Sequence, residues 1–402
     1  MTQRFGDESA LDLVPRFKDQ GYTAEDVRRR REWLEQRLGF ELPLIGTGAI
    51  PTLEMRGNIE NPIGAAQIPL GVAGPLLVNG MHASGTFYVP LATTEGALVR
   101  SYERGMAMLT RAGGVVTRVY ADGNVVVPSF FFDSVEDAYR FTAQLPDRFA
   151  AIKVEAEETT RHGRLERLVP HAVGRTVLVA FHYYTADAQG MNMIVKATDR
   201  AARWIVGSGL APRYQIFSGM SSEKRASGYL LGGVKGKKVV AGALIPAAVL
   251  AAYMRMTPKA VADVWRHTAI GHFQAGAIGF NAHYANGLAA IFIACGQDVA
   301  NVANAAVGIT DFEVTAEGDL YASVTLPSLT VATVGGGTAL GTSRECLSML
   351  GCVGAGHAAK FAEIVAATLL AGELSMAAAI GSGEFVNAHE EYGRNRPHES
   401  GD

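Results

Sequence analysis

The sequence predicts an α+β protein in which a smaller α+β module is inserted into a larger, helix-rich domain. Residues 115 to about 217 alternate β-rich runs with helical stretches, while the sequence on both sides is rich in glycine and in helix-forming residues. Two Ala-rich, weakly charged stretches, 261–295 and 355–380, have helical periodicity. At 402 residues, of which 48% are hydrophobic and 19% charged, the chain exceeds the size of a single core, so two or three domains are expected.

The chain is expected to begin with a small helical segment, residues 1–48. Within it, residues 24–38 place Val27, Trp33 and Leu38 at helical spacing among charged residues. A basic cluster lies on the same helix, and a solvated or subunit-facing surface is favoured for it over contact with an acidic ligand. Its members are Arg28, Arg29, Arg30, Arg31 and Arg37.

The larger domain is predicted to take residues 49–117 and to resume at 216–384. Short apolar runs cut by Gly and Pro favour strands and tight loops as far as Pro90. A helix is then expected to start at an N-cap of Thr93 or Thr94 and to stop at Gly113-Gly114. This would place Glu95 in the first turn of the helix, where the helix dipole favours a negative charge. The apolar face of the helix would carry Leu98, Tyr102, Met106 and Leu109.

The inserted module is assigned to residues 118–215. Its predicted strands are Val115 to Tyr120, Val125 to Phe132 and Thr176 to Tyr184, and its helices are Val135 to Gln144 and a second one after Asn192. In the larger domain, Val261 to Cys295 and Ala355 to Ile380 are predicted to form buried helices. The polar residues 385–402 are expected to be a mobile tail.

Composition excludes several classes of function. A net charge of −3 with acids and bases interspersed argues against nucleic acid as a partner. The N-terminus lacks the pattern of a signal peptide, and Val239 to Met254, interrupted by Gly and Pro, is too short to span a membrane. The sequence therefore predicts a soluble, cytoplasmic protein without a membrane partner.

Its three cysteines, Cys295, Cys346 and Cys352, are interpreted as buried small hydrophobes and not as nucleophiles or metal ligands, so no metal is expected.

Four ionisable residues lie close in the sequence to glycine, alanine or other small residues, where a neutral side chain would pack more easily: Glu95, Lys224, Asp298 and His389. Buried together, carboxylates and an ammonium would hold one another's charge state and could share a proton. Each also has a purely structural alternative: a helix-end charge for Glu95, a cap for Asp298, a surface lysine for Lys224 and a tail residue for His389. Spacing alone does not decide between them.

A run of glycines, Gly335-Gly336-Gly337, follows an apolar segment. It is interpreted either as a loop that approaches a phosphate or as a plain turn. The dinucleotide fingerprint G-x-G-x-x-G after a strand, followed by a spaced acid, is absent from the sequence. Any dinucleotide would therefore bind in another way.

Taken together, five segments in fixed order resemble the 3-hydroxy-3-methylglutaryl-CoA (HMG-CoA) reductase family, in its biosynthetic class I form. They are ENPIGAAQIPLGVAGP (60–75), ATTEGA (92–97), DAQGMNM (187–193), GQD (296–298) and TVGGGT (333–338). The resemblance runs from about Glu54 to His389 and also includes GFNAH (279–283). It implies reduction of HMG-CoA to mevalonate and CoA with two NADPH, a ferredoxin-like NADP-binding module, and a homodimer or dimer of dimers with sites shared between subunits.

The resemblance also implies roles for individual residues. Lys224 would stabilise the oxyanion, Glu95 would donate a proton from a carboxyl kept protonated by burial, Asp298 would tune both, and His389 would protonate the leaving thiolate. Residues implied to bind substrate are Glu60, Asn61, Arg118, Ser218, Arg225 and Asn286. Residues implied to bind NADPH are Arg161, Asp187, Gly190, Met191, Met193, Val334, Gly335, Gly336 and Gly337, with Arg161 facing a 2′-phosphate.

The chain departs from the family pattern around the catalytic lysine. The usual Thr-Asp-Lys-Lys is Ser222-Glu-Lys-Arg225 here, and the loop before it is one residue shorter. Arg225 puts a forked guanidinium where an ammonium is customary, Pro62 replaces an apolar residue and Gln189 replaces a Met. Two alternatives therefore stay open: a reductase of a different acyl-CoA thioester, and a non-catalytic protein that binds CoA or a nucleotide.

Overall fold

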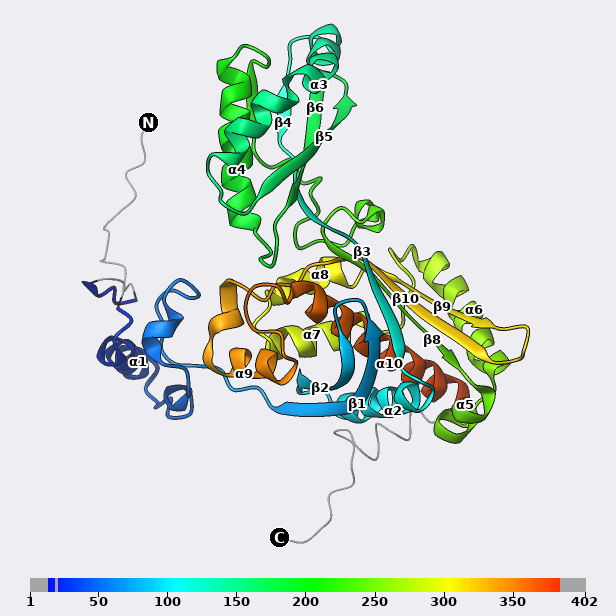
Figure 1. The fold of residues 1–402 in the computed structure, drawn as a ribbon. Coiled ribbons are helices and arrows are strands. Elements are labelled where there is room, and N and C mark those ends of the chain that lie inside the picture. Colours follow the sequence, from blue (N-terminus) through cyan, green and yellow to red (C-terminus); the bar gives the residue numbers. More distant parts are fainter. Residues whose placement is uncertain (1–13, 19–20, 384–402) are drawn as a thin grey trace, which may run out of the picture.

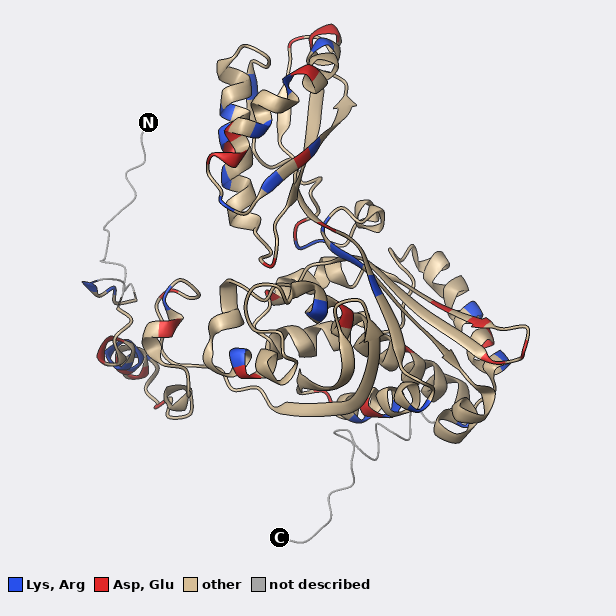
Figure 2. Cartoon of the chain, in the orientation of Figure 1, with Lys and Arg blue, Asp and Glu red and all other residues tan. Residues whose placement is uncertain are grey.

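The computed structural model describes residues 14–18 and 21–383, and it has the predicted plan of a larger body with a smaller module inserted into it. Figure 1 shows the module standing away from the main body, joined to it through β3 (Val115–Val126) and the segment that follows β7 (Arg213–Gln215). Lys and Arg are interspersed with Asp and Glu along its helices (Figure 2). Both bodies contain helices and strands, so the α+β prediction is confirmed.

The sheet of the main body has the order β2-β1-β3-β8-β10-β9, in which β1 and β3 are parallel and the other neighbours are antiparallel. Its strands are β1 (Leu70–Gly80), β2 (Ser84–Ala92), β3 (Val115–Val126), β8 (Gly236–Ile245), β9 (Ile309–Val314) and β10 (Leu320–Leu329). β3 is long enough to leave this sheet and pair with β6 (Thr176–Tyr184) in the module, through Asn124 to Val126. One strand therefore belongs to both bodies.

Helix α10 (Ala358–Ser382) lies at the centre of the main body, where almost every residue from Phe361 to Ala378 is buried. In the described part of the chain it is the one helix that is long and apolar enough to cross a membrane, but 78% of its apolar window is buried in the protein. It therefore acts as a core helix. The other helices of this body are α2 (Leu98–Arg111), α5 (Ala247–Met254), α6 (Pro258–Ala275), α7 (Tyr284–Ala294), α8 (Val302–Ala305) and α9 (Gly341–Met349).

The inserted module has its own hydrophobic core and a βαββαβ topology. Its elements are β4 (Ser129–Phe131), α3 (Val135–Glu157), β5 (Arg164–Val173), β6 (Thr176–Tyr184), α4 (Met191–Gly207) and β7 (Arg213–Gln215). The antiparallel strand order is β7-β4-β6-β5, which is the order of a ferredoxin-like sheet. Both helices pack on the core that includes Phe130, Phe141 and Ile194. The predicted ferredoxin-like module is confirmed.

Three helix predictions need correction. α2 begins at Leu98, and neither Thr93 nor Thr94 is its N-cap. Ala97 has a left-handed φ of 69°, so the right-handed helix cannot extend back through it. α3 continues past Gln144 to Glu157 with Pro146 inside it. The predicted buried helix 261–295 is two helices, α6 and α7, separated by left-handed Gly276 and Gly279, and α6 leaves Ile270 and Phe273 exposed.

The N-terminal helix α1 (Ala24–Leu38) has the predicted bounds, with Thr23 as its N-cap and Gly39 in the left-handed region as its C-cap. The prediction of a solvated surface is wrong for one of its arginines. Arg30 is fully buried, and its guanidinium donates to the carbonyl oxygen of Pro62 at 2.6 Å. Arg31 donates to the carbonyl oxygen of Ile63 at 3.2 Å, so α1 holds the segment that follows Asn61.

A buried carboxylate, Glu363 on α10, holds the turn between β1 and β2. It accepts hydrogen bonds from the backbone N–H groups of Met81, His82 and Ala83 at 3.2, 2.8 and 2.7 Å.

Five short 3-10 helices complete the described chain: η2 (Ile45–Thr47), η3 (Thr52–Met55), η4 (Gly228–Gly232), η5 (Val299–Asn301) and η6 (Gly336–Ala339).

Replacing Glu363 by alanine is expected to lower the free energy of unfolding by roughly 2–4 kcal/mol, because three backbone donors lose their acceptor. The measurement is thermal and urea unfolding of the variant against the wild type. Glu317→Ala, at an exposed position in the β9–β10 turn, is the control and should leave stability unchanged. Equal melting temperatures for the two variants would contradict the assigned role of Glu363.

Candidate active site

Lys224 and Asp298 form an ion pair at the edge of the main body, with 2.8 Å between Nζ and Oδ2. Lys224 lies in the loop between β7 and η4, and Asp298 is the N-cap of η5, directly after α7. The Oδ1 atom of Asp298 accepts the N–H of Ala300 at 3.1 Å, which leaves Oδ2 for the lysine. The hydrogen bond from the ammonium to Asp298 raises the pKa of Lys224, so the pair holds Lys224 in its charged form.

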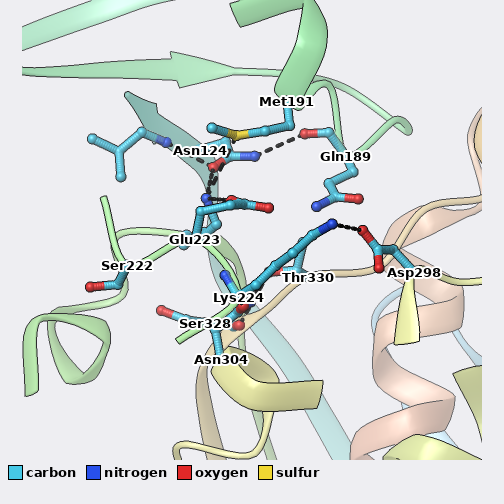
Figure 3. A network of polar contacts seen from close by, with 12 residues as sticks. Asn124, Gln189, Met191, Ser222, Glu223, Lys224, Asp298, Asn304, Ser328 and Thr330 are labelled. Carbon is cyan, nitrogen blue, oxygen red and sulfur yellow. Dashed lines mark hydrogen bonds and ion pairs between the residues drawn. The ribbon is translucent and has the colours of Figure 1, made fainter. Parts of the chain in front are cut away.

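The backbone of the Lys224 loop is unusual. Ser222 and Lys224 both have left-handed φ angles, 54° and 53°, which non-glycine residues adopt only where the surroundings hold them. The N–H of Lys224 donates to Oδ1 of the fully buried Asn304 at 3.1 Å. Figure 3 shows the lysine side chain extending from this loop to Asp298.

Glu95 lies before α2 and not in its first turn, which corrects the predicted position. Its N–H donates to Oγ1 of Thr93 at 3.0 Å, so the threonine holds the turn at Glu95 and does not cap the helix. The carboxylate accepts from Nδ2 of Asn286 at 3.2 Å. Glu95 is exposed, so this chain alone does not supply the burial that was expected to keep its carboxyl protonated.

A cavity of about 700 Å³ opens beside Glu95, between α2 and the start of α7. Tyr102, His283 and Asn286 line it together with Glu95. The ring of His283 is held by the carbonyl oxygen of Gly372 at 2.8 Å, and its backbone N–H by the buried Glu373 at 2.9 Å. The cavity is therefore lined in part by polar side chains that hydrogen bonds hold in place, and Glu95 on its lining is exposed to solvent.

The two halves of the predicted catalytic set lie at opposite ends of α7. Asn286, which contacts Glu95, is near its N-terminal end, and Asp298 follows its C-terminal end. An α-helix of 11 residues is about 16 Å long. Within one chain the structure thus brings Lys224 to Asp298 and Glu95 to Asn286, but it does not bring the two pairs together.

The predicted cofactor segments meet one another. The carbonyl oxygen of Asp187 accepts the N–H of Thr333 at 3.0 Å, which places residues 187–193 beside the glycine run. The carboxylate of Asp187 accepts from the N–H groups of Gly356 and Ala358, at 2.8 and 3.1 Å, at the start of α10. Oγ1 of Thr160 donates to the sulfur of Met193 at 2.9 Å, so the exposed Arg161 belongs to the same neighbourhood.

Two features of these segments suit an anion. Gly190 caps α4 with a left-handed φ of 70° and offers no side-chain bond to the first turn, so the first N–H groups of a 17-residue helix remain available to a ligand. Gly335 and Gly336 have positive φ angles, and a side chain added at either would meet only open space. Val334 beside them is exposed.

The predicted substrate residues lie on four segments, one of which is α7 with Asn286, already described beside Glu95. Ser218 donates from Oγ to the carbonyl oxygen of Val127 at 2.6 Å, and the exposed Arg225 lies close to Gly219. Arg118 is exposed on β3. Glu60 and Asn61 are exposed in the segment held by α1, and Asn61 has a left-handed φ of 49°.

Sequence reasoning missed two buried residues of the site, Lys235 and Asn304. Lys235 is fully buried beside Glu223, the residue before Lys224. Asn304 donates from Nδ2 to Oγ1 of Thr330 at 2.9 Å while it holds the Lys224 backbone. The one available signal was Lys235 itself, a lysine directly before the glycine that opens an apolar strand.

The remaining predictions concern the tail histidine, the cysteines and a metal. His389 lies outside the described residues. Cys295, Cys346 and Cys352 are buried, and burial raises the pKa of each thiol, that of Cys352 to about 12, which disfavours the reactive thiolate. Among residues 14–18 and 21–383 there is no cluster of three His, Cys, Asp or Glu side chains placed to hold a metal ion.

The sequence and the fold both resemble known proteins. The family model described as Hydroxymethylglutaryl-coenzyme A reductase matches residues 26–394. The chain is 44% identical to the 3-hydroxy-3-methylglutaryl-coenzyme A reductase of Methanocaldococcus jannaschii, over 91% of this chain and 92% of that protein. It is 39% identical to the reductase of Xenopus laevis, over 86% of this chain and 40% of that protein. Among solved structures, the class II reductase of Streptococcus pneumoniae bound to NADPH has a TM-score of 0.67 and 19% identity, covering 88% of this chain and 96% of that one.

Proposed function

The chain belongs to the hydroxymethylglutaryl-coenzyme A reductase family, and on that premise we propose that it reduces HMG-CoA to mevalonate and CoA with two NADPH, as a class I enzyme. The observation that carries this proposal is the Lys224–Asp298 pair. Asp298 directly follows Gly296 and Gln297, of which Gly296 packs on the Gly337 carbonyl and Gln297 donates to that of Ala332, and this supports a site shared with the glycine run. The class I assignment is supported by identities of 39–44% to the archaeal and Xenopus relatives, against 19% to the class II structure.

In the proposed mechanism, Lys224 stabilises the negative charge that develops on the thioester oxygen. An ammonium aimed at a developing oxyanion contributes most when it is already oriented, and Asp298 orients Lys224 and keeps it protonated. Asp298 is therefore assigned to support the lysine. NADPH, when bound, supplies the hydride for each of the two reductions.

Glu95 is proposed as the proton donor to the oxygen of the aldehyde in the second reduction. Asn286 holds its carboxylate at 3.2 Å and leaves the other oxygen for a substrate. A carboxylic acid that donates near neutral pH needs burial, and we assign that burial to bound substrate and to a second subunit. His389, which is outside the described residues, keeps the proposed role of protonating the leaving CoA thiolate.

NADPH is proposed to bind along the segments that the structure brings side by side. Its phosphates would lie at the uncapped start of α4, at Gly190, Met191 and Met193, and along Val334 to Gly337. Arg161, exposed near Met193, would face the 2′-phosphate that distinguishes NADPH from NADH. The substrate carboxylate is assigned to Arg118, Ser218, Arg225 and Asn286, and the CoA end to Glu60 and Asn61.

We further propose a cytoplasmic homodimer, or dimer of dimers, in which each active site takes residues from two subunits. The separation of Glu95 from Lys224 along α7 supports this, because a single site needs both residues. The exposed Ile270 and Phe273 on α6 supply apolar surface of the kind that subunits cover.

Mixing two inactive variants, Glu95→Gln and Lys224→Ala, should restore about a quarter of the wild-type activity after subunit exchange. Random mixing makes half of the dimers hybrid, and one of the two shared sites in each hybrid receives both native residues. The measurement is NADPH oxidation before and after mixing. Each variant taken alone through the same exchange procedure is the reference, and no gain on mixing would contradict shared sites.

The activity itself is tested by following NADPH oxidation with HMG-CoA, with NADH in parallel and mevalonate identified as the product. Two NADPH consumed for each mevalonate is the expected result. A panel of other acyl-CoA thioesters checks the alternative that the Ser222–Arg225 loop selects another substrate. NADPH binding without turnover on any thioester would overturn the proposal.

A further inference from the structure

Lys235 is a fully buried lysine, although lysine is among the residues least often buried. It lies directly before β8, and an ammonium in such a place requires a counter-charge and hydrogen-bond acceptors. Burial lowers the pKa of Lys235, and the neighbouring Glu223 carboxylate opposes that change. The proposed reaction gives this side chain no role.

Three separate segments provide its partners. The ammonium forms an ion pair with the carboxylate of Glu223, a hydrogen bond of 3.0 Å with Oδ1 of Asn124, and a contact of 3.7 Å with the sulfur of Met191. Glu223 belongs to the Lys224 loop, Asn124 to β3, and Met191 to the start of α4. Figure 3 shows Asn124, Met191 and Glu223 gathered together, with Lys224 extending away from them to Asp298.

Asn124 extends the network further into the segment 187–193. While its Oδ1 accepts from Lys235, its Nδ2 donates to the carbonyl oxygen of Gln189 at 2.9 Å. The segment is therefore held at two points, the Gln189 carbonyl and the Met191 sulfur, and both lead to Lys235. This is the segment assigned to NADPH.

On the other side, the network fixes the residue before Lys224. Glu223 stands between two residues in the left-handed region, Ser222 and Lys224, a conformation that persists only when its surroundings hold it. Lys235 holds the Glu223 side chain, and Asn304 holds the Lys224 N–H. With both ties in place, the Lys224 side chain leaves the loop toward Asp298.

We propose that Lys235 is a positioning residue that couples the NADPH segment, residues 187–193, to the catalytic Lys224 loop through its bonds to Asn124, Met191 and Glu223. This inference rests on the proposed function for the identity of the cofactor and of the catalytic lysine. The coupling follows from the contacts themselves. A glutamate at position 223, in place of the customary shorter aspartate, is long enough to reach the buried ammonium.

The test uses two variants, because removing one partner of a buried pair leaves the other uncompensated and endangers folding. Lys235→Met removes the ammonium alone, and Lys235→Met with Glu223→Gln removes both charges and is expected to fold. The matched controls carry the same changes at an ion pair inside the module, Lys153→Met and Lys153→Met with Glu157→Gln, whose native separation is 2.7 Å. Each is measured for melting temperature, for kcat, for KM of NADPH and for amide hydrogen exchange.

In the double variant we expect kcat to fall roughly 10-fold or more and KM for NADPH to rise about 10-fold, since small misplacements of reacting groups are costly. Amide exchange should accelerate in both 187–193 and 220–226. A purely structural role would lower the folded fraction, and hence kcat, without raising KM. The controls should keep native kcat, KM and exchange in both segments.

Two results would overturn the proposal: native kcat and KM in the folded double variant, or faster exchange in only one of the two segments. A wild-type protein that does not oxidise NADPH with HMG-CoA would instead contradict the proposed function. In that case the exchange measurement, which needs neither ligand, still decides whether Lys235 couples the two segments.

Discussion

Replacing Lys224 by alanine is expected to lower kcat for HMG-CoA reduction by roughly 10³-fold, a larger effect than any other single substitution in the site. The side chain carries the ammonium that pairs with Asp298, and the substitution removes it. Binding of NADPH, measured by fluorescence titration, should change by less than about threefold, because the contact is made with the reacting oxygen and not with the cofactor.

Lys259→Ala is the matched control for this prediction. Lys259 on α6 is also an exposed lysine paired with an aspartate, with 2.5 Å between Nζ and Oδ2 of Asp263, and its loss should leave kcat unchanged. A Lys224→Ala enzyme that keeps more than about a tenth of the native kcat would remove the lysine from the proposed mechanism.

Replacing Asp298 by asparagine should lower kcat by roughly 10²-fold and move the alkaline limb of the pH profile to lower pH. The hydrogen bond to Asp298 is the largest cause of the raised pKa of Lys224. Without that negative charge the pKa of the lysine falls. Since activity requires the ammonium and is lost as pH rises through its pKa, the loss begins at a lower pH.

The check is kcat measured from neutral to alkaline pH for Asp298→Asn, with Asp263→Asn on α6 as the control for loss of a half-buried carboxylate paired with lysine. The control should keep the wild-type profile. An alkaline limb that stays in place, or moves to higher pH, would show that Asp298 does not maintain the charge of Lys224.

Local signals in the sequence are sufficient for elements whose ends are set by their own residues. α1 starts at Thr23 and stops at Gly39 because the cap residues are present, and β6 has the predicted bounds Thr176–Tyr184. α3 is predicted to end before Pro146, yet it continues, because packing of its buried face on the module core outweighs the local preference of proline.

The candidate site is predictable in its residue types more than in its geometry. Lys224 and Asp298 are 74 residues apart in the sequence, and their pairing depends on where η5 and the loop after β7 lie in the fold. Glu95 is predicted to lie in a helix because Thr93 resembles an N-cap, whereas left-handed Ala97 delays the helix to Leu98. Lys235 is missed because its burial depends on three distant segments, and its place before the glycine of an apolar strand does not identify those segments.

Arg30, the buried arginine of α1, reduces the conformational entropy of the segment that leads to the main body. Its bond to the Pro62 carbonyl joins residues 32 positions apart and so closes a loop, which excludes many of the conformations that an untethered chain would explore. Glu60 and Asn61, assigned to the CoA end of the substrate, lie at the edge of that closed loop. Their ordering takes place when the protein folds, and a ligand that arrives later loses less free energy in fixing them.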